Sequence, residues 1–329
     1  MDLRTTIKIE PSESKISHAT PVAFIGSCFA AEIAGKMTEG KMSAHVNPFG
    51  TVYNPVSISN TLSAILEKRQ FSKKDLFKYK ERYISLLHYT SFSSDDPEGL
   101  LDRINTNIAS SHDFLRSAKI LFVTFGTARV YRLRETGMIV SNCHKLPESL
   151  FSQELLNVDE VVLLWTELLD KLREFNRDIK VIFTVSPVRH LKDGAHGNQV
   201  SKSVLFLAVE KLLSHPSSGG YFPAYEILID DLRDYRYYAE DMVHPTSTAV
   251  DYIWKAFSEC YLTSDALSVW KEARTITKAL NHRFLTDSVS AKNDFANGML
   301  RQISALGRKA PWIDLDKENS YFKEIISPL

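Results

Sequence analysis

The chain has 329 residues, and its 40 basic and 40 acidic side chains give a formal net charge of zero. This balance excludes a strongly basic field over the whole molecule, so we expect no nucleic-acid partner. No uninterrupted apolar run approaches the roughly 20 residues that a membrane-spanning helix needs, so we expect no membrane partner either. The composition is typical of a soluble globular protein.

The cysteine content argues against disulfides. Cys28, Cys143 and Cys260 are an odd and sparse set, unlike the framework of a small secreted domain. Residues 1–15 contain no apolar core of signal-peptide length. We therefore expect a cytoplasmic protein with three free thiols and no bridge between Cys28 and Cys143.

Apolar segments of strand length alternate with amphipathic segments along most of the chain. Residues 128–142 alternate and turn at Thr136-Gly137, which predicts a hairpin. Residues 39–55 are rich in Gly, Asn and Pro, which predicts a loop. Other strands are predicted at 21–27, 83–92, 119–126, 179–187 and 221–230. Helices are predicted at 28–37, 56–69, 97–118, 158–176, 199–214 and 245–262.

Buried strands separated by amphipathic helices predict an α/β fold with a mostly parallel sheet covered on both faces. We assign residues 1–264 to this domain. The later segments are more polar, have helical spacing and lack a strand pattern. We therefore assign residues 265–329 to a helical extension packed on the domain. Within the domain, Ser57 or Ser59 is the expected N-cap of the second helix.

Several unusual residues come directly after predicted strands. Ser27, Gly126 and Ser186 each follow one, and the stretch around His244 follows the last one. Ligands of parallel sheets collect at the carboxyl ends of the strands. We therefore expect a functional site at this edge of the sheet.

Ser27 and Cys28 lie at the mouth of the first strand-to-helix turn. One explanation is packing, because small side chains let a helix fold back closely on a sheet. The other is chemistry, because such a turn presents a nucleophile above the sheet edge beside backbone N–H groups. These residues alone leave both explanations open.

Asp241 and His244 are three residues apart, in the order D-x-x-H. A tight turn would bring the carboxylate to the His Nδ1–H, fix the tautomer and leave Nε2 free as a base. A serine hydroxyl needs such a base to become a nucleophile. Alternatively, the pair only satisfies local backbone before the next helix, whose expected N-cap is Thr246 or Ser247.

The pentapeptide at residues 26–30, GSCFA, resembles the signature of the GSCFA family, which we group with the SGNH (GDSL-like) hydrolases. Further segments resemble family segments in the same order, and together they cover roughly residues 20–260. These segments are NPFGTVYNP at 47–55, TFGTARVYR at 124–132, NCHK at 142–145, SPVRH at 186–190 and DMVHP at 241–245. The resemblance implies a three-layer α/β/α sandwich and serine-hydrolase chemistry.

The resemblance also implies roles for individual residues. The nucleophile of the first SGNH block maps onto Ser27, and the acid and base of the last block map onto Asp241 and His244. SGNH enzymes usually have Gly-Asp-Ser where this chain has Gly-Ser-Cys. Cys28 as the nucleophile of a thiol hydrolase therefore stays an alternative to Ser27.

The chain departs from SGNH enzymes at the oxyanion hole. Their third block carries an Asn donor, but Gly126 is followed here by Thr-Ala-Arg. The N–H groups of Ser27 (or Cys28) and Gly50 are the expected backbone donors. One lost donor can lower the rate on the order of 100-fold, so the gap bears directly on hydrolysis.

Asn142 is our choice for the missing amide, because the hairpin could carry it back over the strand end, and Asn47 and Asn54 are the alternatives. Arg189 and His190 follow a buried strand and are expected to bind substrate, together with Asn47. Arg189 could equally pair with a neighbouring carboxylate.

Together with these residues, the resemblance implies an SGNH-type acyl-ester hydrolase or acyltransferase that uses Ser27, His244 and Asp241. The expected partner is a small-molecule or carbohydrate acyl ester. The His and Asp residues of 190–196 match no closed zinc pattern, so we expect neither a metal nor a cofactor. The rival is a non-catalytic ligand-binding protein with an incomplete oxyanion hole.

Overall fold

The computed structural model describes residues 5–285 and 288–326. The chain divides into two compact units. The first comprises the chain up to Ser14, Pro21–Ala34 and Ala44–Cys260; the second comprises Lys15–Thr20, Gly35–Ser43 and the chain from Tyr261 onward. The two short N-terminal stretches of the second unit lie outside the predicted extension, 265–329. That the extension packs on the sheet domain stays a prediction.

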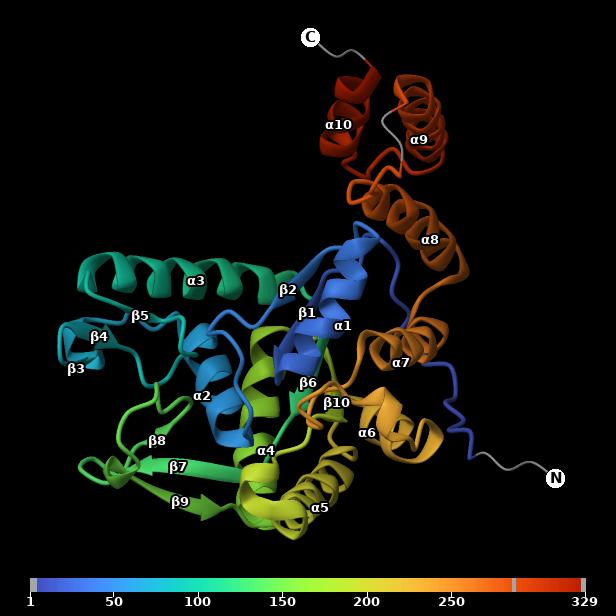
Figure 1. Ribbon diagram of the computed structural model, residues 1–329. Coiled ribbons are helices and arrows are strands. Elements are labelled where there is room, and N and C mark those ends of the chain that lie inside the picture. Colours follow the sequence, from blue (N-terminus) through green and yellow to red (C-terminus); the bar gives the residue numbers. More distant parts are fainter. Residues whose placement is uncertain (1–4, 286–287, 327–329) are drawn as a thin grey trace. The chain divides into compact units, whose positions relative to one another are not determined.

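Strands and helices alternate along the first unit (Figure 1). The strands are β1 Val22–Gly26, β2 Ala44–Val46, β3 Phe77–Tyr79, β4 Arg82–Ile84, β5 Ser93–Ser94, β6 Ile120–Phe125, β7 Arg129–Leu133, β8 Ile139–Val140, β9 Phe151–Leu155, β10 Lys180–Val185 and β11 Ser218–Tyr221. The α-helices are α1 Cys28–Glu39, α2 Pro55–Leu66, α3 Pro97–Ser117, α4 Val158–Phe175, α5 Gly194–Leu212, α6 Ala224–Glu226, α7 Ser247–Tyr261, α8 Ser264–Ala279, α9 Val289–Lys309 and α10 Asp316–Ile326. Short helical turns occur at Lys73–Asp75, Glu148–Leu150, Leu191–Asp193, Ile227–Asp231 and Tyr235–Tyr237.

The central sheet has five strands in the order β11-β10-β6-β1-β2. Every neighbouring pair in it is parallel. The register pairs Gly26 with Thr124 and Thr124 with Thr184, so β1, β6 and β10 end side by side. This arrangement confirms the predicted parallel sheet and brings the residues that follow these strands to one edge.

Helices cover both faces of the sheet, which completes an α/β/α sandwich. On one face, α2, α3, α4 and α5 pack on strand residues that include Ile25, Val123 and Phe183. On the opposite face, the ring of Phe257 from α7 lies 4.9 Å from that of Phe122. Burial of large apolar side chains on both faces is the main stabilising term for such a sheet.

Two small antiparallel sheets accompany the central one, with the orders β3-β4-β5 and β8-β7-β9. The predicted hairpin at 128–142 is confirmed, and Gly137 adopts a φ of 71° at its turn. Strand β9 was not predicted. It pairs antiparallel with β7, with Arg129 opposite Leu155 at one end and Leu133 opposite Phe151 at the other. In Figure 1, β7 and β9 extend to the lower left of the central sheet.

Several local predictions were wrong or incomplete. The strand predicted at 83–92 ends early, because β4 stops at Ile84 and the next strand, β5, begins at Ser93. Residues 221–230 do not form a strand: β11 ends at Tyr221, and helical turns follow it. Pro223 cannot donate to a strand ladder, which explains this ending. The predicted loop at 39–55 contains the short edge strand β2.

The N-cap of α2 is Asn54 rather than Ser57 or Ser59. Its Oδ1 accepts a hydrogen bond from Ser57 N at 2.8 Å, and Pro55 occupies the first helical position, where no N–H is needed. At α7, Thr246 caps as predicted, because its Oγ1 accepts from Ala249 N at 3.3 Å.

The second unit has its own core, built from α8, α9 and α10 around residues such as Ile276, Leu306 and Phe322. Its N-terminal stretches are tied to these helices. Lys41 Nζ lies 2.6 Å from the carboxylate of Glu318, whose side chain is 1% exposed. In the part of the chain that the structure describes, no helix is long and apolar enough to cross a membrane.

Gly26 is the position where the fold tolerates a side chain least. Its φ is 137°, and a Cβ would lie 2.2 Å from the Thr124 carbonyl oxygen. Gly26→Ala should therefore lower the free energy of unfolding by about 2 kcal/mol or more, measured by urea denaturation. Gly35→Ala is the control, because a Cβ there meets nothing within 4 Å; it should leave stability unchanged or raise it. Equal effects of the two variants would contradict the close approach of β1 to β6.

Candidate functional site

The loop between β2 and α2 wraps around the end of β1. Gly26 N donates to Asn47 Oδ1 at 2.8 Å, and the Gly26 carbonyl accepts from Val52 N at 3.1 Å. The Tyr53 carbonyl accepts from Gly126 N at 2.7 Å, directly after β6. The loop therefore ties together the ends of β1 and β6.

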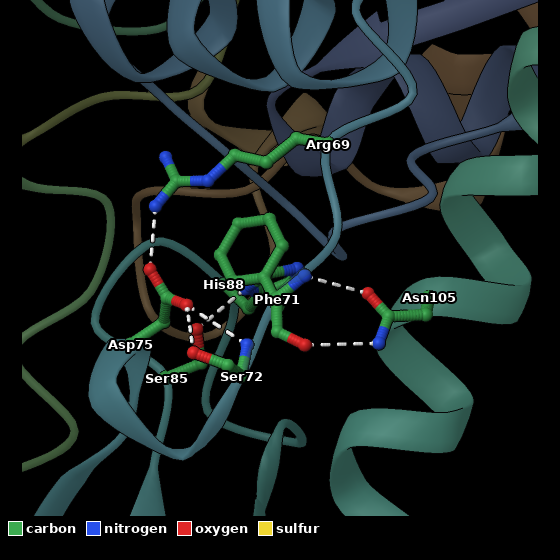
Figure 2. A network of polar contacts seen from close by, with 7 residues as sticks. All are labelled: Arg69, Phe71, Ser72, Asp75, Ser85, His88 and Asn105. Atoms are coloured by element: carbon green, nitrogen blue, oxygen red, sulfur yellow. Dashed lines mark hydrogen bonds and ion pairs between the residues drawn. The ribbon is translucent and has the colours of Figure 1, made fainter.

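A cluster of aromatic rings packs against Phe49 of this loop. Phe49 stacks on His88 with ring centroids 3.8 Å apart, and Phe71 meets both rings at steep angles. In Figure 2, Ser85 bonds the His88 ring, and Asn105 bonds both backbone groups of Phe71. Burial lowers the pKa of His88 to about 3, so the ring is neutral and packs as an aromatic.

Ser27 follows β1 directly and is 1% exposed. Its Oγ donates to Ser186 Oγ at 2.9 Å. Ser186 follows β10 in the same way, and its Oγ also accepts from Val188 N at 3.3 Å. The hydroxyl pair therefore spans from the end of β1 to the end of β10, across β6.

The ammonium group of Lys202 lies beside this hydroxyl pair. The side chain comes from α5 and is 2% exposed, and Nζ donates to the carbonyls of Gly126 and Ser186 at 2.7 Å each. Burial lowers the pKa of Lys202 to about 7, because desolvation penalises the charged form. Lys202 thus joins the ends of β6 and β10 through a partly charged group at neutral pH.

The turn at Asp241 holds His244 in one orientation. Asp241 Oδ1 accepts from the backbone N of Val243 and His244 at 2.9 and 3.0 Å, and Oδ2 lies 2.7 Å from His244 Nδ1. These hydrogen bonds lower the pKa of Asp241 to about 2, and the bond from the His244 backbone N–H has the largest effect. Because an ionised carboxylate can only accept, Nδ1 carries the proton and Nε2 is left as an acceptor. The predicted contact is present; its catalytic role stays a prediction.

One cavity of about 690 Å³ is lined by both Ser27 and His244. Ser27 is buried, whereas the His244 side chain is 50% exposed. Among the described residues, the Ser27 hydroxyl bonds Ser186 and not His244. The structure therefore brings the predicted nucleophile and base to one cavity without joining them.

Arg189 and His190 also line the cavity. The Arg189 guanidinium carbon lies 5.2 Å from the centroid of the Tyr238 ring. The His190 ring meets Tyr53 edge-on, and its Nε2 is buried without a hydrogen-bond partner among the described residues. Burial lowers the pKa of His190 to about 4, so the ring is neutral.

Two predicted site residues, Asn47 and Gly50, make hydrogen bonds within the protein. Asn47 was expected to bind substrate, but its Oδ1 accepts from Gly26 N, and Asn47 is absent from the cavity lining among the described residues. The Gly50 N–H, expected in the oxyanion hole, donates to the Asn47 carbonyl at 2.7 Å. The Ser27 N–H is also engaged, since it donates to the Thr124 carbonyl at 3.2 Å.

Asn54 and Asn142 both line the cavity. Asn54 is 5% exposed and uses Oδ1 to cap α2, so its Nδ2 is the group left to donate. It follows the loop that binds Gly26. Asn142 belongs to the turn after β8, where its Oδ1 accepts from His144 N and Thr90 Oγ1. The backbone hydrogen bonds to the ends of β1 and β6 come from Val52 and Tyr53, the two residues directly before Asn54.

The three cysteines are free, and Cys28 and Cys143 line the cavity. Burial raises the pKa of both thiols, that of Cys143 to about 11. A thiolate is disfavoured at both positions, which argues against Cys28 as the nucleophile. Within the described parts of the chain, no three His, Cys, Asp or Glu residues are grouped to hold a metal ion.

Sequence reasoning missed Lys202 and gave Ser186 no role. A signal existed for each. Ser186 follows its strand as Ser27 follows β1. Lys202 falls on the buried stripe of α5, three residues before Leu205 and six before Ala208, where a lysine is unusual.

Comparison with known proteins gives one result that bears on this site. The sequence model of the GSCFA family matches residues 21–257, which include every residue that lines the cavity. A search of curated proteins found no match.

Lys202 predicts how stability depends on pH. Its pKa is about 7 in the folded protein, against an ordinary 10.5, so the unfolded chain binds more protons between these values. The Lys202 contribution to the free energy of unfolding is therefore constant well below pH 7 and rises above it. The free energy of unfolding of the wild type minus that of Lys202→Met should rise on the order of 2 kcal/mol from about pH 6 to about pH 9, measured by urea denaturation. A difference that stays flat or shrinks would contradict the buried ammonium.

Proposed function

We propose that this chain, which belongs to the GSCFA family, is a serine hydrolase or acyltransferase that acts on acyl esters. The observation that carries the proposal is that Ser27 and the oriented Asp241–His244 pair line one cavity at the carboxyl edge of the sheet. The SGNH-type chemistry that we inferred from the sequence motifs uses the same three residues.

In the proposed reaction, Ser27 Oγ attacks the acyl carbonyl. Its hydroxyl rotates away from Ser186 as its proton passes to His244 Nε2, and Asp241 stabilises the imidazolium that forms. The imidazolium then protonates the leaving alcohol, which leaves an acyl-Ser27 intermediate. Water or an acceptor hydroxyl, deprotonated by His244, attacks this intermediate. The bond between the acyl carbon and Ser27 Oγ breaks, His244 returns the proton to Ser27 Oγ, and the acyl group leaves as the acid or the new ester.

The developing oxyanion needs donors that face the cavity. We assign this role to Asn54 Nδ2 and to the N–H of Cys28, in the first turn of α1, where N–H groups have no partner within the helix. Ser186 and Lys202 act as positioning residues: Ser186 holds the Ser27 hydroxyl at rest, and Lys202 fixes Ser186 through its carbonyl.

The substrate we propose is a small-molecule acyl ester, and an acylated carbohydrate fits the cavity's mixed lining. Tyr131 offers an aromatic face, and Asn142 and Gln153 offer amide groups for sugar hydroxyls. The rival function is non-catalytic ligand binding. The hydrogen bond of Ser27 to Ser186 instead of to His244 favours this rival.

A covalent probe separates the two functions. A fluorophosphonate should label Ser27 in the wild type, and labelling should be lost in Ser27→Ala and fall sharply in His244→Ala, because the base activates the hydroxyl. Mass spectrometry locates the adduct. An adduct on Cys28 would support the thiol alternative, and an unlabelled, folded protein would support the non-catalytic rival.

Substitution can locate the amide of the oxyanion hole. Asn54→Ser keeps an N-cap for α2 but removes the amide donor, so folding should change little. On any ester that is turned over, kcat should fall roughly 100-fold with a much smaller change in KM. Asn142→Ala is the matched control and should retain kcat within a few-fold. The reverse pattern would assign the donor to Asn142, as the sequence suggested, and full activity in both would leave backbone donors alone.

A further inference from the structure

The charged side chains that line the cavity around Ser27 are mostly cations. Four basic side chains line it, whereas one carboxylate, Glu148, does so among the described residues. The four basic residues are Arg129, Lys145, Arg189 and Lys192. A water-filled hollow with this lining attracts negative charge.

Two of the four cations are already paired. Arg129 Nε lies 3.3 Å from Asp193, which also accepts from Gln153, and Lys192 lies 2.7 Å from Glu148. In the described parts of the chain, no carboxylate lies within ion-pairing distance of the remaining two, Arg189 and Lys145. These two charges are the ones available to a ligand.

The backbone places Arg189 between the two reacting groups. Its N donates to the Val243 carbonyl at 3.2 Å, directly before His244. The preceding residue, Val188, donates to Ser186 Oγ, which bonds Ser27. A ligand group held by Arg189 is therefore close to the ester that Ser27 would attack.

The Arg189 guanidinium is also supported for recognition. Its central carbon lies over the Tyr238 ring, 5.2 Å from the centroid. A guanidinium in a cation–π contact keeps its N–H donors, which match a carboxylate or phosphate in pairs. Lys145 lies on the wall formed by the turn after β8, where neighbouring His144 is fixed by bonds to the carbonyls of Ser85 and His88.

We propose that the ester bound in this cavity carries an oxyanionic group, a carboxylate or a phosphate, that pairs with Arg189 and is attracted by Lys145. The inference rests on the proposed function for the ester, but the anion site can be tested without any turnover.

Matched esters test the substrate class. Wild-type kcat/KM for 4-acetoxybenzoate should exceed that for 4-acetoxybenzamide about 10- to 100-fold, the range for a hydrogen-bonded charge pair. An acyl-side pair, the adipate monoester and hexanoate ester of 4-nitrophenol, reports on which side of the ester the anion lies. Preference for the charged member of either pair supports the site.

Variants distinguish recognition of the anion by Arg189 from an effect of the protein's total charge. Arg189→Gln should bring the ratio for the preferred pair close to one, and Lys145→Gln should lower it several-fold. Lys180→Gln removes the same charge at the start of β10, the opposite end of the strand from the cavity, and should leave the ratio unchanged. An equal loss in Lys180→Gln and Arg189→Gln would overturn the assignment to Arg189.

A binding experiment makes failure of the two proposals distinguishable. Ligand-observed NMR titrations of Ser27→Ala should show benzoate or phenyl phosphate binding at least tenfold more tightly than benzamide, with the preference lost in Ser27→Ala/Arg189→Gln. The tighter of the two anions identifies the group. Such binding without turnover of any ester would overturn the hydrolase and keep the anion site. Turnover without a preference for charged esters, or equal binding of benzamide and both anions, would overturn the anion site.

Discussion

The backbone of Gly26 is the constraint on which the site depends. A Cβ there would lie 2.2 Å from the Thr124 carbonyl oxygen, so only glycine lets β1 and β6 run together to this point. Gly26 N–H binds Asn47 and its carbonyl binds Val52, so the loop is fastened to the strand end. Ser27 is the first side chain beyond this junction, and the same loop leads to Asn54. The position of the proposed nucleophile, Ser27, and that of the proposed amide donor, Asn54, thus have one common origin.

Lys202 is the second constraint, and its burial is energetically unfavourable. Moving an ammonium group into the interior is unfavourable, as its lowered pKa indicates, and two carbonyl acceptors offset only part of that penalty. What the group provides is geometry, since it joins the ends of β6 and β10 where hydrogen bonds of the sheet ladder stop. A methionine of similar length could fill the space, but it would leave the carbonyls of Gly126 and Ser186 unsatisfied. The charge also contributes to a positive field in the cavity, in the same sense as Arg189.

The two halves of the site differ in how firmly they are held. Ser27 is buried and fixed by the sheet, whereas His244 is half exposed on a turn whose orientation depends on Asp241. Asp241 keeps its charge through local hydrogen bonds rather than through burial, so the orienting contact persists in the absence of substrate. Arg189 N binds the carbonyl of Val243, which lies in the same turn as His244, so an anion held by Arg189 would bring its ester toward the proposed base and nucleophile. Substrate binding and assembly of the reacting groups are therefore expected to be coupled.

The sequence by itself determined the elements that depend on local pattern. Continuous apolar runs marked β1, β6 and β10, the three central strands of the parallel sheet, because burial on both faces requires them. The spacing of Asp241 and His244 fixed a contact within one turn. Asn47 and Gly50 belong to the segment at 47–55 that resembles the GSCFA family, and both were predicted to act in the site. In the structure, both make hydrogen bonds that hold the loop. The contact of Lys202 with Gly126 joins residues 76 positions apart. Only the tertiary structure decided such pairings. A buried polar group meets its partner when separate strands and loops pack together, and the spacing of residues along the chain does not determine which distant segments meet.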